Sequence, residues 1–137
     1  MTTTLVPSRL LRLALLVDAA GSGATGLLFA LGYGPLAGLT GLPRMLLLAC
    51  GVFFVAYAAF VFWLGRHERP LAALVKLVVA GNLVWGLDSL LALWIGWLSP
   101  TGLGMALVVA QAAFVLVIAA VQGAGLRQSS PARLAAA

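Results

Sequence analysis

The chain of 137 residues is 64% hydrophobic and only 8% charged, and its formal net charge is +5. This composition is too apolar for a soluble domain, and the few basic residues do not form the clustered basic face that a nucleic-acid-binding domain needs. A single cysteine and a single histidine exclude an intrachain disulfide, a cysteine–histidine metal cluster and haem ligation by paired histidines.

Four apolar segments are long enough to cross a lipid bilayer as helices. At ~1.5 Å rise per residue, about 20 apolar residues span the hydrocarbon core. We predict spanning helices at about 10–31, 45–64, 71–98 and 103–125, with loops near 32–44, 66–70 and 99–102 where Gly, Pro and polar residues gather. The apolar runs do not alternate with polar residues, which excludes a spanning β-barrel. The expected fold is an all-α integral membrane protein, a compact bundle of four transmembrane helices in a single transmembrane domain over 1–137.

The basic residues lie almost entirely at one end of the predicted helices. Only Arg44 lies at the other end; the seven that share one end are Arg9, Arg12, Arg66, Arg69, Lys76, Arg127 and Arg133. Lys76 is inside the third segment, but its side chain can extend back toward that end. Under the positive-inside rule, this bias places both termini in the cytoplasm. We therefore expect a multi-pass protein of the bacterial inner (plasma) membrane, in contact with the lipid bilayer and without a nucleic-acid partner.

The two halves of the chain resemble each other. A shift of 61 residues places Thr40-Gly41-Leu42 on Thr101-Gly102-Leu103, Phe53 on Phe114, Arg66 on Arg127 and Pro70 on Pro131, and a shift of 63 places Thr25 on Asp88. The sequence thus predicts two duplicated helical hairpins, at about 8–69 and 70–131. Each half contains two spans, so the halves insert in parallel orientation, unlike the inverted repeats of many transporters.

A glycine-rich stretch in the first segment matches the spacing of a dinucleotide-binding motif at Gly21, Gly23 and Gly26. The context of that motif is missing, because no soluble βαβ unit is present and the next acidic residue after Asp18 is Glu68. Pairs of small residues four apart instead favour close helix packing. We predict a small-residue face that contacts the third helix or shares a core with it, formed by Ala19, Ser22, Gly23 and Gly26.

Asp18 is one of two carboxylates inside the predicted spans. It lies ~12 Å into the first segment, and Lys76 lies ~8 Å into the third from the same end, with Arg12 also in possible reach. A carboxylate in hydrocarbon needs a partner or a function. Two interpretations follow: an ion pair between Asp18 and Lys76 that orients two helices, or a proton- or ion-binding carboxylate gated by Lys76.

Asp88 is the second intramembrane carboxylate, and we expect it ~15 Å from the other end of the third segment. Polar residues of comparable depth occur in the other helices, namely Thr25, Cys50 and Gln111. Helical spacing gathers Asn82, Trp85, Asp88 and Ser89 on one face of the third helix. We therefore predict a polar layer in the bundle interior, with Asp88 beside Gln111 and Thr25. Such a layer can hold helices in register or can carry out a function.

No nucleophile–base pair, metal cluster or phosphate-binding loop is recognisable, so we predict no catalytic residue, no metal and no cofactor. Three functions from different classes remain. The first is a non-enzymatic subunit or accessory component of a membrane assembly, as a homo- or hetero-oligomer. The second is a small oligomeric transporter or channel for protons, ions or small polar solutes that uses Asp88 and Asp18. The third is a binder of a lipid or another hydrophobic ligand.

Overall fold

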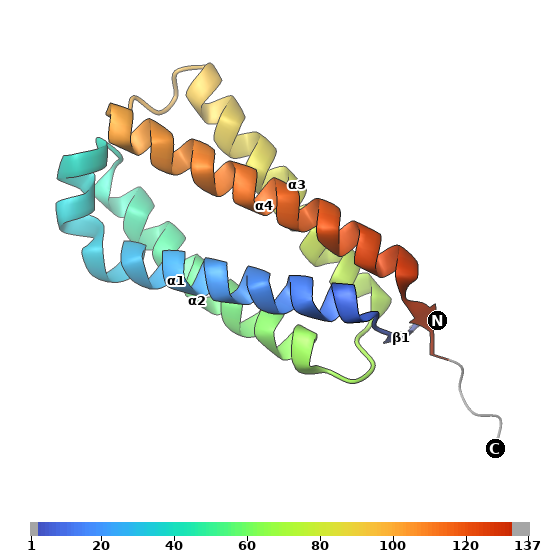
Figure 1. The fold of residues 1–137 in the computed structure, drawn as a ribbon. Helices are drawn as coiled ribbons and strands as arrows, with labels where there is room; N and C mark the ends of the chain where they lie inside the picture. The colour runs from blue at the N-terminus through green and yellow to red at the C-terminus, as the bar shows by residue number, and fades with distance from the viewer. Residues whose placement is uncertain (1–2, 133–137) are drawn as a thin grey trace.

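The computed structural model describes residues 3–132, and Arg133 lies outside this part of the chain. Its elements are β1 (Leu5–Val6), α1 (Arg9–Thr40), α2 (Arg44–Arg66), α3 (Ala72–Trp94), α4 (Gly102–Gln128) and β2 (Ser130–Pro131) (Figure 1). Each of the four helices is long and apolar enough to span a membrane. The predictions of an all-helical fold and of four segments with the properties of membrane spans are therefore confirmed.

The helices form two hairpins, α1–α2 and α3–α4, that lie side by side (Figure 1). Helix α1 packs closely along α2 and also against α4, whereas α3 packs mainly against α4. Helices α2 and α3 make few contacts with each other. The bundle is therefore closed on the side where α1 meets α4 and open on the side between α2 and α3.

Helix α1 continues well beyond its predicted end, so the loop expected at 32–44 is wrong. Glycine and proline usually break helices in water, but a helix in apolar surroundings tolerates both when neighbouring groups satisfy the freed backbone atoms. Pro35 lies inside α1, and the helix ends only at Gly41. Gly41 adopts a left-handed backbone conformation (φ 69°), and its N–H donates to the carbonyl of Ala37 at 2.9 Å. This is a common helix-terminating geometry, and it leaves a short connection to Arg44.

Helix α3 ends at Trp94, four residues before the predicted end at 98. The chain turns at Gly96, whose φ of 74° is readily available to glycine but strained for other residues. The N–H groups of Trp97 and Leu98 both donate to the carbonyl of Ala92 and close this turn. The earlier helix end places Asp88 six residues from the end of α3, nearer to it than expected.

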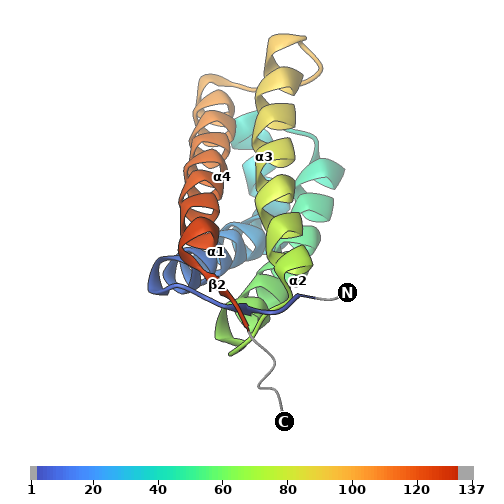
Figure 2. The same cartoon turned by 90° about the vertical axis from the view of Figure 1, so that its right-hand side faces the viewer.

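A short β-structure, which the sequence did not predict, ties the chain ends together at one end of the bundle (Figure 2). Leu5 of β1 pairs with Pro131 of β2, and its N–H donates to the carbonyl of Pro70 at 2.9 Å. The N-terminal segment thus lies between the α2–α3 loop and the C-terminal segment. We call this the terminal end, and we call the opposite end, with residues 41–43 and 95–101, the loop end. At the loop end, Thr101 N–H donates to the carbonyl of Thr40 at 2.9 Å.

The small-residue face of α1 packs chiefly against α2. A Cβ atom built on Gly26 would lie 2.8 Å from the backbone nitrogen of Val55, and one on Gly23 would lie 3.4 Å from the Cβ of Ala58. The expected direct contact with the third helix through this face is therefore replaced by contact with the second. The predicted alternative, a core shared by α1 and α3, is found in the terminal half, where Leu11, Leu15 and Ala19 cluster with Val75 and Val78.

Candidate functional site

A polar cluster that draws on all four helices surrounds Asp18, whose side chain is fully buried. Its Oδ2 atom accepts hydrogen bonds from Asn82 Nδ2 at 2.8 Å, Gln122 Nε2 at 2.8 Å and Tyr57 Oη at 2.9 Å. Its Oδ1 atom accepts from Ser22 Oγ at 3.1 Å, one helical turn along α1. The carboxyl group thus links α1 to α2, α3 and α4 through neutral donors.

The partners of Asp18 also bond to each other. Asn82 Nδ2 lies 3.2 Å from Gln122 Oε1, and the Tyr57 hydroxyl lies 3.1 Å from Asn82 Oδ1. Among the described residues, no buried side-chain nitrogen or oxygen lacks a hydrogen-bond partner. A fully satisfied polar network in a low-dielectric interior rigidifies the packing around it. The arrangement therefore holds the four helices in one register.

Lys76 does not contribute to this cluster, because its side chain is exposed. It lies six residues before Asn82, and at 3.6 residues per turn this spacing puts the two side chains on different faces of α3. The ion pair expected between Asp18 and Lys76 is therefore not formed, and neutral donors take its place.

Sequence reasoning included Asn82 and Ser22 among the site residues but omitted Tyr57 and Gln122. A signal for Gln122 was available, since a glutamine inside an apolar helix at a depth near that of Asp18 needs a buried partner.

A second polar group links α3 to α4 nearer the loop end. Trp85 Nε1 donates to Gln111 Oε1 at 2.9 Å, Gln111 Nε2 donates to Ser89 Oγ at 3.0 Å, and Ser89 Oγ donates to the carbonyl of Trp85 at 2.7 Å. Thr25 is half-buried on α1, Asp88 is exposed on α3, and neither joins these bonds. The expected layer of Asp88, Gln111 and Thr25 is therefore divided, and Trp85 and Ser89 are the partners of Gln111.

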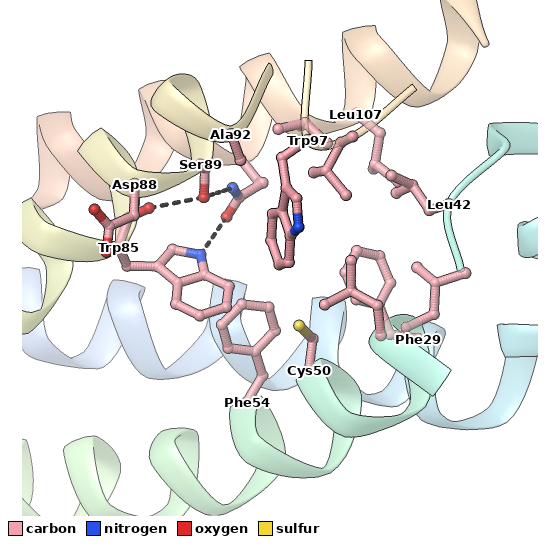
Figure 3. Close-up of a pocket in the computed structure, with 15 residues that line it drawn as sticks. Phe29, Leu42, Cys50, Phe54, Trp85, Asp88, Ser89, Ala92, Trp97 and Leu107 are labelled. Atoms are coloured by element: carbon pink, nitrogen blue, oxygen red, sulfur yellow. Dashed lines mark hydrogen bonds between the residues drawn. The ribbon is translucent and has the colours of Figure 1, made fainter. Parts of the chain in front are cut away.

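A cavity of about 340 Å³ lies beside this second group, on the open side of the bundle between α2 and α3 (Figure 3). We call it the lateral pocket. Its wall is predominantly apolar and draws on α1, α2, α3, α4 and both connections at the loop end: Phe29, Leu42, Leu46, Leu47, Cys50, Phe54, Trp85, Asp88, Ser89, Ala92, Trp97, Leu98, Leu107, Val108 and Gln111. The rings of Phe54 and Trp85 meet edge-to-face at 5.0 Å and bridge α2 and α3.

Asp88 stands at the edge of the lateral pocket, beside Trp85 (Figure 3). Among residues 3–132, no side chain forms a hydrogen bond or an ion pair with its carboxylate. The same described residues contain no group of three or more His, Cys, Asp or Glu side chains that could hold a metal ion. The lateral pocket thus combines a large apolar wall with one acidic group at its edge.

Comparison with known proteins does not assign a relative: no protein-family model, no curated protein and no solved structure matches this chain.

Proposed function

We propose that this protein is a multi-pass protein of the bacterial inner membrane, without enzymatic chemistry, whose termini are both in the cytoplasm. Four helices of spanning length and hydropathy support insertion. Six described basic residues lie toward the terminal end, and only Arg44 lies at the loop end. Under the positive-inside rule, this bias favours a cytoplasmic terminal end and a periplasmic loop end.

Within that frame, we propose that the protein binds a hydrophobic molecule taken from the bilayer. The lateral pocket is the observation that carries this proposal. Its volume of about 340 Å³ is in the range of small-molecule sites, and Phe29, Phe54, Trp85 and Trp97 supply aromatic surface. Because α2 and α3 make few contacts, a ligand can enter sideways from the lipid without crossing a polar surface.

The polar clusters favour binding over transport through the bundle. Asp18 has no exposed surface, and its two carboxylate oxygens accept four hydrogen bonds from protein groups. A transported ion or solute would have to break this network at the centre of the bundle. The Asp18 cluster is therefore better explained as the structural support of the pocket than as part of a permeation path.

Filling the pocket tests this proposal. Ala92 is a small half-buried residue of the pocket wall, and Ala92→Phe adds a ring that occupies part of the cavity. In phosphatidylcholine nanodiscs, energy transfer from tryptophan to a neutral dansyl-labelled alkyl amide should be saturable for the wild-type protein. We expect Ala92→Phe to weaken this binding about tenfold, equivalent to ~1.4 kcal/mol.

The matched control is Ala80→Phe, which adds the same ring to an exposed position of α3 outside the pocket. It should leave the affinity for the neutral probe unchanged. Equal affinity of Ala92→Phe and wild type, or purely non-saturable partitioning of the probe, would contradict a binding function for the pocket.

A subunit role in a membrane assembly is the second candidate function. It is favoured by the exposed strip of α3 next to the pocket, where Leu77, Gly81 and Val84 are all exposed and a Cβ on Gly81 would meet nothing within 4 Å. A helix of another copy or of a partner could pack on this strip. Native mass measurement of the protein in nanodiscs distinguishes a monomeric binder from an oligomer.

A further inference from the structure

We infer that the lateral pocket selects a hydrophobic cation, an amine whose ammonium group pairs with Asp88 while its apolar part occupies the pocket. This inference rests on the proposed binding function and specifies its ligand class. Three features carry it: a free carboxylate on the pocket edge, its depth in the bundle, and the aromatic surface next to it.

Asp88 has a carboxylate without a neutralising partner among the described residues. Two other polar side chains that line the pocket, Ser89 and Gln111, are bonded to each other and to Trp85, and neither bonds to the carboxylate. The basic residues of α2, α3 and α4 are Arg44, Arg66, Lys76 and Arg127, all exposed, and none of them forms an ion pair with Asp88. Lys76 is twelve residues away on α3, which is ~18 Å along the helix.

The depth of Asp88 makes a partner necessary. It lies six residues before the end of α3, which is ~9 Å along the helix axis. In addition, a helical side chain points toward the N-terminus of its helix, which directs the carboxylate further inward. In the proposed orientation, this level is in the hydrocarbon of the outer leaflet. An unpaired carboxylate there is costly, and a cation supplied by the ligand removes that cost.

The surroundings of Asp88 suit an ammonium group on an apolar body. Asp88 and Trp85 are three residues apart and are therefore neighbours on the surface of α3. Figure 3 shows both at the same edge of the pocket, with Trp97 and Phe54 further along it. An ammonium group gains from an aromatic face as well as from a carboxylate. Conversely, an anionic amphiphile would place a second negative charge beside Asp88 and is disfavoured.

A set of three matched probes tests the inference. They share one alkyl chain and one dansyl group and end in an ammonium, a neutral amide or a carboxylate. In phosphatidylcholine nanodiscs, we expect the ammonium probe to bind the wild-type protein about tenfold more tightly than the amide probe, because its charged group can donate a hydrogen bond to the Asp88 carboxylate. The carboxylate probe should bind most weakly of the three.

Asp88→Asn should abolish the preference for the ammonium probe over the amide probe, whereas Asp88→Glu should retain this preference. The control Glu68→Gln removes an acidic group from an exposed position in the α2–α3 loop and should change nothing. If Ala92→Phe weakens all three probes but Asp88→Asn does not alter their order, the pocket binds and the inference about its ligand is wrong. If Ala92→Phe has no effect, the proposed function itself fails.

Two sources can supply such an amine, and a competition experiment separates them. Phosphatidylethanolamine added to the nanodiscs should displace the ammonium probe if the natural ligand is an aminophospholipid headgroup. If only a free alkyl amine displaces it, the ligand is a lipophilic amine dissolved in the bilayer. Displacement by neither compound would overturn the inference.

Discussion

Asp18 on α1 and Asp88 on α3 are both carboxylates inside long apolar helices, yet their surroundings are opposite. Asp18 is fully buried and accepts four hydrogen bonds, whereas Asp88 is exposed at the edge of the lateral pocket. A buried donor that loses its acceptor costs about 1–3 kcal/mol. The stability of the bundle should therefore depend on Asp18 and hardly at all on Asp88.

Replacing both carboxylates by leucine tests this difference at the level of single residues. We expect Asp18→Leu to lower the free energy of unfolding by about 3 kcal/mol or more, because Asn82, Gln122 and Tyr57 lose their shared acceptor. Asp88→Leu, as the matched control, should leave it nearly unchanged. Thermal unfolding in detergent, followed by circular dichroism, measures both. A larger loss for Asp88→Leu than for Asp18→Leu would contradict the assigned roles.

At the scale of the elements, the contact between α1 and α2 depends on the absence of two side chains. Gly26 and Gly51 face each other, and a Cβ on Gly51 would overlap the backbone of Ala30. Backbone contact of this kind strengthens packing between apolar helices, which gain little from the hydrophobic effect in lipid. It also explains why α1 packs more closely on α2 than on its other neighbours.

A single added methyl group tests this contact. We expect Gly51→Ala to lower the free energy of unfolding by about 1–3 kcal/mol, because the backbone of α1 must move away to accommodate it. The matched control is Gly123→Ala in α4, where an added Cβ meets nothing within 4 Å. That change should be neutral or stabilising by up to about 1 kcal/mol, since alanine favours a helix over glycine. Equal effects of the two substitutions would show that the Gly51 contact is not tight.

On the scale of the whole molecule, the buried positions of the two hairpins correspond. A shift of 61 residues carries six of the seven buried positions of α2 onto buried positions of α4. For α1 and α3 a shift of 64, instead of the 63 inferred from sequence, carries Leu11, Ala14, Asp18 and Ser22 onto Val75, Val78, Asn82 and Gly86. Asp18 thereby corresponds to its own hydrogen-bond donor Asn82. The duplication over about 8–69 and 70–131 stays a prediction that this pattern supports.

The orientation of the whole molecule can be tested by labelling. In a Cys50→Ala background, a cysteine at Ser99 in the loop end should react with a membrane-impermeant thiol reagent added to spheroplasts. A cysteine at Gln128, exposed near the terminal end, should react only after the membrane is permeabilised. The opposite pattern would place the termini in the periplasm and remove the basis for locating Asp88 in the outer leaflet.

The sequence alone determined the number of helices, their approximate positions and the strong bias of basic residues toward one end. These properties depend on the local density of apolar residues and on charge along the chain, so they can be read without knowing any contact. The end of α1 escaped this reasoning because Gly and Pro break helices in water but are tolerated where the backbone can be satisfied otherwise. The early end of α3 was not predictable either, because the sequence does not distinguish Gly96 from the other glycines. Only its backbone conformation, with a positive φ, shows that the chain turns there.

Only the tertiary structure decided which polar residues meet. Depth along a helix can be estimated from residue counts, but the rotation of each helix about its axis depends on packing along its whole length. Residue counts predict similar depths for Asp88, Gln111 and Thr25, yet these residues face different neighbours, while Asp18, Tyr57 and Gln122 converge from three helices. The opening between α2 and α3 has the same origin. Helix α2 packs on α1 through the close contact of Gly26 with Gly51, and α3 packs mainly on α4. Few contacts join α2 to α3, and the lateral pocket lies between these two helices.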